Sequence, residues 1–386
     1  MAYTEKTTIS YGSRVKNSFG GIGTGFILLI AAVVMLWWNE GRAVKTAKML
    51  KEAEGVAVHM PDVNTLDPQY QDKLIHANGT VVTLDSLIDA DFKVGVRGMR
   101  LTRTVSYYQW VEHSSTTKED KLGGSQEITT TYTYSTEWTS SPVNSSDFKD
   151  PDYKNYNHGG VRRQVEDKDY IAKNAKIGAY RLPEDMISSF PQGNMMPLML
   201  TIKGDSAGMH VNNNEIYFGA NPADPMVGDV RVEYRYIPAQ NVVSLIAKVQ
   251  GDTFTSYTAK NGKTFRALVM GERTMEEMFE SEKAGNSMLT WILRIIGFFL
   301  ISAGLKMIFD LLSTLLKVVP FLSSIMSWSV GLICNIIAFA LTLIVVAIAW
   351  LFYRPILSVS LLAVACAAVY YFVMKAEKKK QQNTES

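Results

Sequence analysis

The sequence predicts an α-helical multi-pass membrane protein with four transmembrane helices and a large extracytosolic α+β domain dominated by antiparallel sheet. Three observations support this fold class. Apolar runs lie near both ends of the 386-residue chain, basic residues flank them on one side, and the long middle alternates apolar with polar residues. The formal net charge is +2, but the middle is mildly acidic. This charge distribution opposes nucleic-acid binding, which needs a basic face on the folded domain.

The first apolar run, residues 19–38, predicts the first transmembrane helix, preceded by an amino-terminal tail of residues 1–18. At about 1.5 Å per residue, a helix of this length covers a hydrocarbon core of about 30 Å. The run has no charge and ends in Trp37 and Trp38, which favour the membrane interface. Because a signal peptide has a shorter apolar core and small residues at its cleavage site, the sequence predicts an uncleaved anchor.

Three further transmembrane helices are predicted near the carboxyl end of the chain. Their ranges are residues 289–309, 328–353 and 356–374, and a basic tail of residues 375–386 follows. Arg354-Pro355 separates the last two helices, and a charged helix breaker suits a tight turn at the membrane surface. Residues 310–327 contain Lys317 and Pro320. They therefore predict a cytoplasmic loop or an interfacial helix.

The basic residues predict that both termini are cytoplasmic. Lys6, Arg14 and Lys16 precede the first helix, and basic residues also flank the 310–327 loop and follow the last helix. Residues 39–288 are then extracytosolic, which means lumenal in a eukaryotic host. In a bacterial host the domain is periplasmic or external, and the membrane is the inner, or plasma, membrane.

The middle domain is predicted to begin and end with juxtamembrane helices. Residues 40–54 carry apolar side chains at helical spacing and continue directly from the first membrane helix. Thr274 and Glu277 have the spacing of a capping box, which predicts the start of a helix that returns to the membrane. Both helices are expected to couple the membrane to the domain without a flexible linker.

Between these helices the sequence predicts strands. Residues 228–236 and 131–138 alternate apolar and polar side chains, and residues 100–112 and 241–254 are two further strand candidates. Asn261-Gly262 predicts a hairpin turn. Polar segments at residues 118–124 and 144–160 predict loops, and the strands before and after residue 165 could form two lobes.

Small and polar residues within the membrane helices predict helix packing. Gly21 and Gly25 are four residues apart, and Gly297 and Gly304 are seven apart, so each pair lies on one helix face. These faces are expected to associate between copies in a homo-oligomer. Asn335, deep in the third helix, is expected to form a hydrogen bond across a helix interface.

Aromatic and basic residues near the helix ends are predicted interface anchors. Arg294 and Lys306 lie about one turn from the ends of their helix, where a long side chain can reach the interface. The predicted anchors are Trp37, Trp38, Trp291, Trp328, Trp350, Arg294, Lys306 and Arg354.

No residue pattern predicts catalysis, a cofactor or a metal site, so the sequence predicts a protein that is not an enzyme. The five histidines lack a second ligand at metal-binding spacing. Cys334 and Cys366 lie within apolar runs, and a nucleophile elbow is absent. The acid pairs Asp167/Asp169 and Glu276/Glu277 lie in charged segments and are interpreted as solvated surface. The sequence leaves open whether the glycosylation sequons at Asn78 and Asn144 are used.

Six short segments together resemble one family. They are NEGRAVKTA at 39–47, YQWVE at 108–112, YSTEW at 134–138, VGDVRV at 227–232, NSMLTW at 286–291 and LFYRP at 351–355. In this order and spacing they are similar to the LUMA (transmembrane protein 43) family. The resemblance implies four spans, cytoplasmic termini, a lumenal domain and self-association. In animals it implies residence in the endoplasmic reticulum and inner nuclear membrane, where members organise nuclear-envelope proteins including lamins and emerin. Bacterial relatives have no such partners, and the family supplies no catalytic residues.

The leading functional hypothesis is a non-enzymatic oligomeric membrane scaffold that organises protein complexes or lipids through its extracytosolic domain. Expected partners are membrane lipids, further copies of the chain and other membrane proteins, but not nucleic acid. One alternative is a channel or channel subunit lined by Asn335, Ser302 and Thr342. Another is a membrane-tethered hydrolase or ligand sensor with a cleft in the middle domain.

Overall fold

The computed structural model describes residues 2–157, 159–201, 208–315, 320–356, 358 and 360. The chain divides into two compact units. The domain unit comprises Met1–Thr7, Met49–Lys118 and Ile128–Ser281, and the membrane unit comprises Thr8–Lys48, Glu119–Glu127 and Glu282–Ser386.

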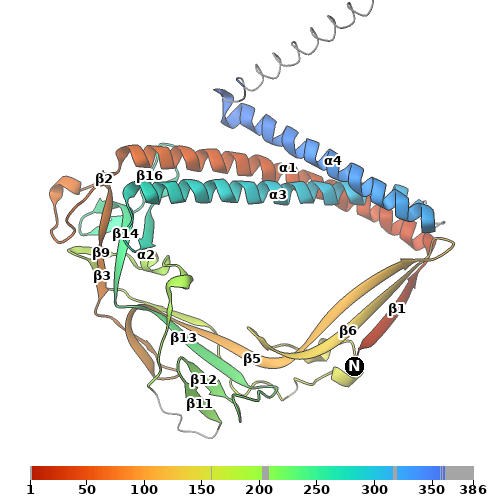
Figure 1. Cartoon of the computed structure of the whole chain (residues 1–386), viewed down its shortest axis with the longest axis horizontal. Coiled ribbons are helices and arrows are strands. Elements are labelled where there is room, and N and C mark those ends of the chain that lie inside the picture. Colours follow the sequence, from red (N-terminus) through yellow and green to blue (C-terminus); the bar gives the residue numbers. More distant parts are fainter. Residues whose placement is uncertain are drawn as a thin grey trace, which may run out of the picture. The chain divides into compact units, whose positions relative to one another are not determined.

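Long helices form most of the described part of the membrane unit (Figure 1). They are α1 (Tyr11–Val56, 46 residues), α3 (Met275–Leu315, 41 residues) and α4 (Pro320–Tyr353, 34 residues). Each contains a stretch that is long and apolar enough to cross a membrane, within Tyr11–Val56, Met275–Leu311 and Val330–Tyr353. The predicted helix over residues 356–374 and the tail over residues 375–386 lie almost wholly outside the described residues.

Helix occupies most of residues 310–327, for which a cytoplasmic loop or an interfacial helix was predicted. Helix α3 continues to Leu315 and α4 already begins at Pro320, so the described residues here contain no long loop. The predicted break at Pro320 is instead a helix start, where proline is well tolerated because the first amide has no helical partner.

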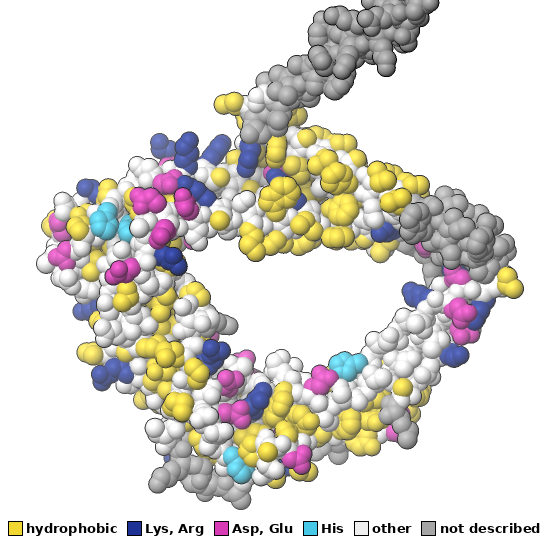
Figure 2. Space-filling model, viewed as in Figure 1, with side chains coloured by type: hydrophobic (Ala, Val, Ile, Leu, Met, Phe, Trp, Pro, Cys, Tyr) yellow, Lys and Arg dark blue, Asp and Glu magenta, His cyan; other side chains and the backbone are white. Residues whose placement is uncertain are grey.

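Apolar packing holds the three helices together. The buried core of this unit is formed by Ala32 and Leu36 of α1, Ile301 and Leu305 of α3, and Cys334 and Ala338 of α4. Hydrophobic side chains also cover the outer surface of these helices (Figure 2). Helices that are apolar all round are typical of a lipid environment.

Two large, mainly antiparallel sheets form the domain unit in the described residues. The first has the strand order β1 (Tyr3–Ile9), β6 (Gln126–Thr139), β5 (Val94–Asp120), β13 (Val230–Pro238), β12 (Glu215–Phe218) and β11 (Met209–Asn212), with β10 (Met196–Pro197), β4 (Ser86–Asp89) and β7 (Lys168–Ile171) paired alongside. The second has the order β18 (Ala267–Met270), β14 (Gln240–Gln250), β15 (Thr253–Thr255), β9 (Tyr180–Leu182), β8 (Ala175–Ile177), β3 (Leu74–Thr83) and β2 (Val58–His59). A hairpin of β16 (Tyr257–Thr258) and β17 (Thr264–Phe265), a short helix α2 (Glu184–Ser188) and four 3-10 turns (Pro68–Tyr70, Ser145–Asp147, Pro151–Tyr153 and Gln192–Asn194) complete the unit.

Local sequence patterns predicted several of these strands correctly. In β13, Val230, Val232 and Tyr234 are fully buried, as the alternating pattern predicted. The turn at Asn261-Gly262 joins β16 to β17, and Gly262 has a φ of +78°, which glycine adopts without strain. The strand candidates at 100–112 and 131–138 lie in β5 and β6, whereas the candidate at 241–254 covers most of β14, a turn and the start of β15.

The interpretation of two lobes divided near residue 165 is wrong. Strand β5 pairs with β13 in one sheet, and β3 pairs with β14 in the other, so each sheet combines strands from both sides of that residue. Both sheets also contribute to one hydrophobic cluster. Sequence order therefore does not separate the domain into halves.

The predicted juxtamembrane helices are the ends of the long helices. Helix α1 runs through Gly41 without a break, and Met49, Leu50 and Ala53 join a buried cluster of the domain unit. Met278 of α3 is buried in the same cluster. The capping box before α3 is confirmed. The Glu277 amide donates to Thr274 Oγ1 at 3.1 Å, and the Thr274 amide donates to Glu277 Oε2 at 3.0 Å.

The tail over residues 1–18 is not a separate segment. Residues of this tail form β1, which pairs with β6 at the edge of the first sheet. The Tyr3 and Tyr132 rings lie 6.2 Å apart, and the Tyr132 hydroxyl donates to Glu5 at 3.2 Å. The predicted loop at residues 118–124 is only a short turn, because β5 continues to Asp120.

Candidate functional site: a polar cluster in the membrane unit and a cavity in the domain unit

Glu40 is a fully buried carboxylate that joins all three helices of the membrane unit. Arg294 of α3 donates from Nε to Glu40 Oε1 at 2.7 Å and from Nη2 to Oε2 at 2.9 Å. Trp350 of α4 donates from Nε1 to Glu40 Oε2 at 2.8 Å. Two parallel hydrogen bonds between guanidinium and carboxylate are the strongest form of this pair. A buried charge is tolerated only when it is paired in this way.

The position of Arg294 near a helix end had suggested that its side chain reaches the membrane interface. Its contacts show instead that it does not extend freely to water. Its guanidinium lies 4.8 Å from the Trp291 ring centre and 5.7 Å from that of Trp350, and both contacts are cation–π interactions. No local pattern identified Glu40 as the partner, and it was only the first residue of the predicted juxtamembrane helix over residues 40–54. The neighbouring Arg354 also lies over the Trp350 ring, at 5.8 Å.

A second group of polar contacts lies next to this pair on α1 and α3. Asn39 donates to the Thr290 carbonyl at 3.1 Å. Arg42 donates to Asn286 Oδ1 and to Thr290 Oγ1, both at 3.0 Å. The Asn286 amide in turn donates to the Ala43 carbonyl at 3.0 Å. We call the whole set the interhelix polar cluster, and it consists of Asn39, Glu40, Arg42, Asn286, Thr290, Arg294 and Trp350.

The predicted glycine faces pack against each other within one chain. A Cβ atom added to Gly25 would lie 2.7 Å from the Gly304 carbonyl oxygen, and one added to Gly304 would lie 2.8 Å from the Gly25 oxygen. A Cβ on Gly297 would lie 2.5 Å from Leu36, and one on Gly21 would lie 3.7 Å from an α3 carbonyl. The prediction that these glycines contact another copy is wrong, because α1 and α3 already cover them.

Asn335 forms the predicted hydrogen bond across helices. Ser302 of α3 donates to Asn335 Oδ1 at 2.6 Å, and Ser302 is only 2% exposed. Thr342 donates to the Ala338 carbonyl of its own helix at 2.7 Å. The three residues of the channel hypothesis therefore form hydrogen bonds inside the bundle, which gives no support to a polar path.

The other predicted anchors have different environments. Trp38 and Trp291 are 58% and 59% exposed, and their role as anchors stays a prediction. Trp37 packs edge-on against Phe352 at 5.0 Å between ring centres, so it also holds α1 to α4. Lys306 is exposed. The side chain of Trp328 lies outside the described residues.

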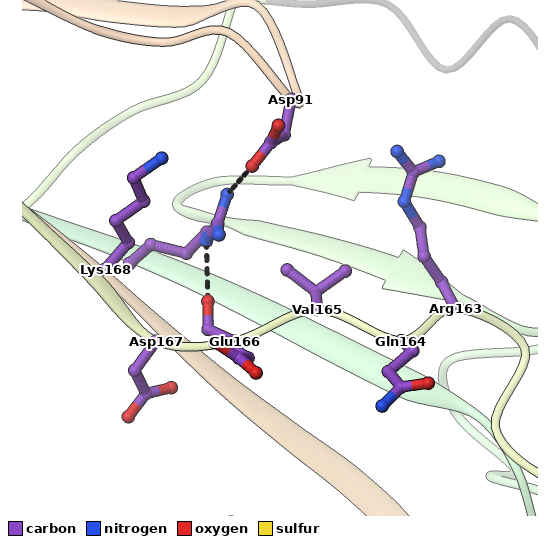
Figure 3. Close-up of a pocket in the computed structure, with 8 residues that line it drawn as sticks. Asp91, Arg163, Gln164, Val165, Glu166, Asp167 and Lys168 are labelled. Atoms are coloured by element: carbon purple, nitrogen blue, oxygen red, sulfur yellow. Dashed lines mark hydrogen bonds and ion pairs between the residues drawn. The ribbon is translucent and has the colours of Figure 1, made fainter.

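The domain unit has a solvent-open cavity of about 750 Å³, lined by Asp91, Arg103 and residues 163–168. Arg103 forms its inner wall. Its guanidinium donates to Asp91 at 2.8 Å and to the Glu166 carbonyl at 2.9 Å (Figure 3). It also donates to the buried Asp89 at 2.7 Å. Burial opposes ionisation, yet the hydrogen bonds to Asp91 and Asp89 raise the pKa of Arg103 above its ordinary value. The Tyr234 hydroxyl also donates to Asp89, at 2.6 Å.

Two further cations lie along the cavity wall. Arg163 and Lys168 point to the same side of the segment, whereas Gln164 and Asp167 point to the other (Figure 3). The Arg163 guanidinium lies over the rings of Phe92 and Phe218, at 4.9 and 5.3 Å. The lining also carries the carboxylates of Asp91, Glu166 and Asp167, so the cavity presents charges of both signs, with Arg163 and Lys168 as the cations that face one side.

The acid pairs considered in the sequence have structural contacts. Asp167 accepts the Val105 amide at 2.7 Å, and Asp169 forms an ion pair with Arg100 at 2.7 Å. Glu277 belongs to the capping box. Within the described ranges, no group of three or more His, Cys, Asp or Glu side chains could hold a metal ion.

The structure also brings together two histidines that are not neighbours in the sequence. His59 Nδ1 lies 3.1 Å from His76 Nδ1, and His76 Nε2 lies 3.0 Å from the Arg273 carbonyl. Burial lowers the pKa of His76. No sequence signal predicted this pair, because it depends on the alignment of β2 with β3.

The membrane helices and the sheet-rich domain define an integral membrane protein. Residues 107–355 match the family model described as transmembrane protein 43, and the chain belongs to this family. It is 31% identical to rat transmembrane protein 43 over 353 residues, covering 89% of this chain and 87% of the relative. The human protein is 28% identical over 378 residues, covering 95% and 93% of the two chains, and the Drosophila melanogaster homolog is 26% identical over 355 residues, covering 90% and 93%. No solved structure matches the chain.

Proposed function

We propose that this protein is a non-enzymatic membrane scaffold that organises membrane proteins or lipids through its large domain. The proposal places the domain on the extracytosolic side of the membrane. In a eukaryotic host this is the lumen of the endoplasmic reticulum and inner nuclear membrane, and in a bacterium it is the outer face of the inner membrane. Lamins and emerin are partners only in an animal-type host.

The observation that supports this proposal most directly is the continuity of α1 and α3. Each helix has residues in the apolar core of the membrane unit and others in a core of the domain unit. In α1 these are Leu36 and Leu50, and in α3 they are Ile301 and Phe279. Packing on both parts stiffens each helix within its unit. Stiff helices suit a protein that holds partners at a fixed position.

The interhelix polar cluster adds to this stiffness. Bidentate pairing of Glu40 with Arg294 requires one relative position of α1 and α3, and Trp350 brings α4 to the same carboxylate. Polar contacts in an apolar bundle specify one arrangement, because any other arrangement leaves a charge without a partner. The described contacts thus support a structural role.

Self-association remains part of the proposal, but through other surfaces. The glycine face is occupied within the chain, whereas the outer faces of α3 and α4 expose large apolar side chains. Examples are Ile295 and Phe299 of α3 and Ile336 and Phe339 of α4. These faces can contact lipid or a second copy.

The test is the mass of the purified protein in lipid nanodiscs, with the co-purifying lipids and proteins identified. A defined oligomer or a reproducible partner is the expected result. The double variant Phe299→Ser with Phe339→Ser is expected to weaken assembly. Gly23→Ser is a matched control, because no atom lies within 4 Å of a Cβ added at that position. A monomer without a retained partner or lipid would contradict the scaffold.

The domain cavity favours a second candidate, a ligand sensor. Arg163 and Lys168 face a space of about 750 Å³ that could receive an anionic ligand. Thermal shift of the full-length protein against a set of phosphorylated and carboxylated compounds tests this candidate. A shift that is lost in Arg163→Ala but kept in Arg97→Ala, at an exposed position, would support it, and the absence of any shift would oppose it.

A further inference from the structure

Three arginines meet a single carboxylate at one end of the helix bundle, in the interhelix polar cluster and beside it. Arg294 forms the pair with Glu40 through two hydrogen bonds. The other two arginines, Arg42 and Arg354, form no ion pair with any residue that the structure describes. Within the described part of the membrane unit, the charges of these two arginines therefore have no carboxylate partner.

Hydrogen bonds hold Arg42 in place without neutralising its charge. Its guanidinium donates to Asn286 Oδ1 and Thr290 Oγ1, both at 3.0 Å, and to Asn39 Oδ1 at 3.1 Å. All three acceptors are uncharged. The Arg42 Nε atom is buried and has no hydrogen-bond partner, which is unusual for a group that serves packing alone. Because the side chain is already positioned, it loses little conformational entropy when it binds an anion.

Arg354 lies beside the same cluster at the end of α4. Its guanidinium lies 5.8 Å from the centre of the Trp350 ring, and the Arg294 guanidinium lies 5.7 Å from that centre. Trp350 also donates to Glu40. Among the described contacts the Arg354 guanidinium forms no hydrogen bond, so its N–H donors remain available to a ligand.

The surroundings of these arginines are typical of the membrane interface. Trp38 of α1 and Trp291 of α3 are 58% and 59% exposed, and tryptophan favours the depth of the lipid headgroups. About one turn further into the apolar part of each helix, Val34 and Ile295 are also exposed. A molecule bound at the arginines can therefore contact an apolar surface as well.

Membrane topology does not account for these charges. In the proposed orientation, this end of the bundle lies on the extracytosolic side, where the positive-inside rule predicts few basic residues. A bound anion accounts for them better. The planar fork of an arginine matches the oxygens of a phosphate group, which it can bind through two parallel hydrogen bonds.

We propose that Arg42 and Arg354 bind the phosphate group of an anionic phospholipid, whose acyl chains lie along the exposed apolar surface of the helices. A lipid with a net negative charge is favoured over a zwitterionic lipid, because the ammonium group of a zwitterionic headgroup offsets the phosphate charge. A free phosphate ion lacks the acyl chains and makes no contact with the apolar surface.

The test is native mass spectrometry of the full-length protein in neutral detergent, titrated with phosphatidylglycerol. Arg42→Gln and Arg354→Gln are each expected to weaken binding by about tenfold, the effect of losing a hydrogen bond to a charged group. Lys306→Gln is the matched control, because it removes an exposed positive charge from α3 about three turns away from Arg294. This control should bind as tightly as the original protein.

Equal affinity of Arg354→Gln, Lys306→Gln and the original protein would overturn the proposal. Arg354→Gln is the decisive variant, since its guanidinium has no hydrogen bond within the described residues whose loss could unfold the bundle. Thermal unfolding without added lipid verifies that both arginine variants are folded.

Two further titrations distinguish the sources of the phosphate. Phosphatidylcholine should bind more weakly than phosphatidylglycerol, and inorganic phosphate at the same concentration should not displace the bound lipid. Equal affinity for the two lipids would contradict the preference for a negative charge. Displacement by inorganic phosphate would show a site for a free anion and would also overturn the proposal.

This inference names a lipid class and its binding residues, and it can fail separately from the scaffold function. An oligomer whose lipid affinity is the same in all variants would contradict the inference and leave the scaffold in place. A monomer that loses phosphatidylglycerol in Arg354→Gln would support the inference and contradict assembly.

Discussion

Replacing Gly25 with alanine tests whether the close contact of α1 and α3 stabilises the membrane unit. The new methyl carbon would lie 2.7 Å from the Gly304 carbonyl oxygen and 2.8 Å from Ile308 Cγ1. The oxygen belongs to the backbone of a helix, so it cannot move alone. The two helices must separate by about 0.7 Å before this contact reaches the ordinary distance of 3.4 Å.

Moving the two helices apart by this distance weakens the packing between them. A gap of about 0.5–1 Å loses about a quarter to a half of the dispersion energy of each contact along the helix pair. Overpacking of a well-packed interface typically costs about 1–3 kcal/mol. At roughly 2–4 °C per kcal/mol, Gly25→Ala should lower the melting temperature by roughly 2–12 °C.

The assay is thermal unfolding in detergent, followed by tryptophan fluorescence. Gly23→Ala is the matched control, since it adds the same methyl group to the same helix at a site with nothing within 4 Å. Gly304→Ala should reproduce the loss, because its methyl group would lie 2.8 Å from the Gly25 oxygen. Equal melting temperatures for Gly25→Ala and Gly23→Ala would refute the reasoning.

Three further predictions concern polar contacts. Glu40→Gln should lower the free energy of unfolding by about 3–5 kcal/mol, because it leaves the Arg294 charge, whose side chain is only 14% exposed, without its carboxylate; unchanged thermal unfolding in detergent would contradict this. Thr274→Ala should cost about 1 kcal/mol through loss of the cap, whereas Thr258→Ala, at an exposed strand position, should cost less in the same denaturant titration. Because burial depresses the pKa of His76 in the folded state, its contribution to stability is present above the unfolded pKa of about 6.5 and falls as pH decreases below it. His76→Gln should therefore flatten the decline in melting temperature from pH 7 to pH 5, and an unaltered decline would exclude His76 as its cause.

Features governed by neighbouring residues were predictable from the sequence. The alternation in β13, the capping box at Thr274 and Glu277, and the turn at Gly262 each depend on side chains a few residues apart. The cross-helix hydrogen bond of Asn335 was also predictable, because a polar side chain in an apolar helix needs a partner.

Features that depend on pairing across the chain were not predictable. Glu40 and Arg294 are 254 residues apart, and nothing near either residue identifies the other. The glycine face was recognised, but the sequence could not show whether its partner was α3 or a second copy. The pairing of β1 with β6 was missed because a short polar strand at the chain start resembles an ordinary tail.

The unbroken course of α1 also fixes the rotational phase between its two packed parts. Each residue of an α-helix turns the next by about 100°. Leu36, in the core of the membrane unit, and Leu50, in a core of the domain unit, thus lie on nearly the same face of the helix. A single inserted residue between them would rotate Leu50 away from its core by about 100°, whereas seven inserted residues would nearly restore its direction. The number of residues between Leu36 and Leu50 therefore sets the directions of these two side chains around the helix axis, and it matters as much as the identity of those residues.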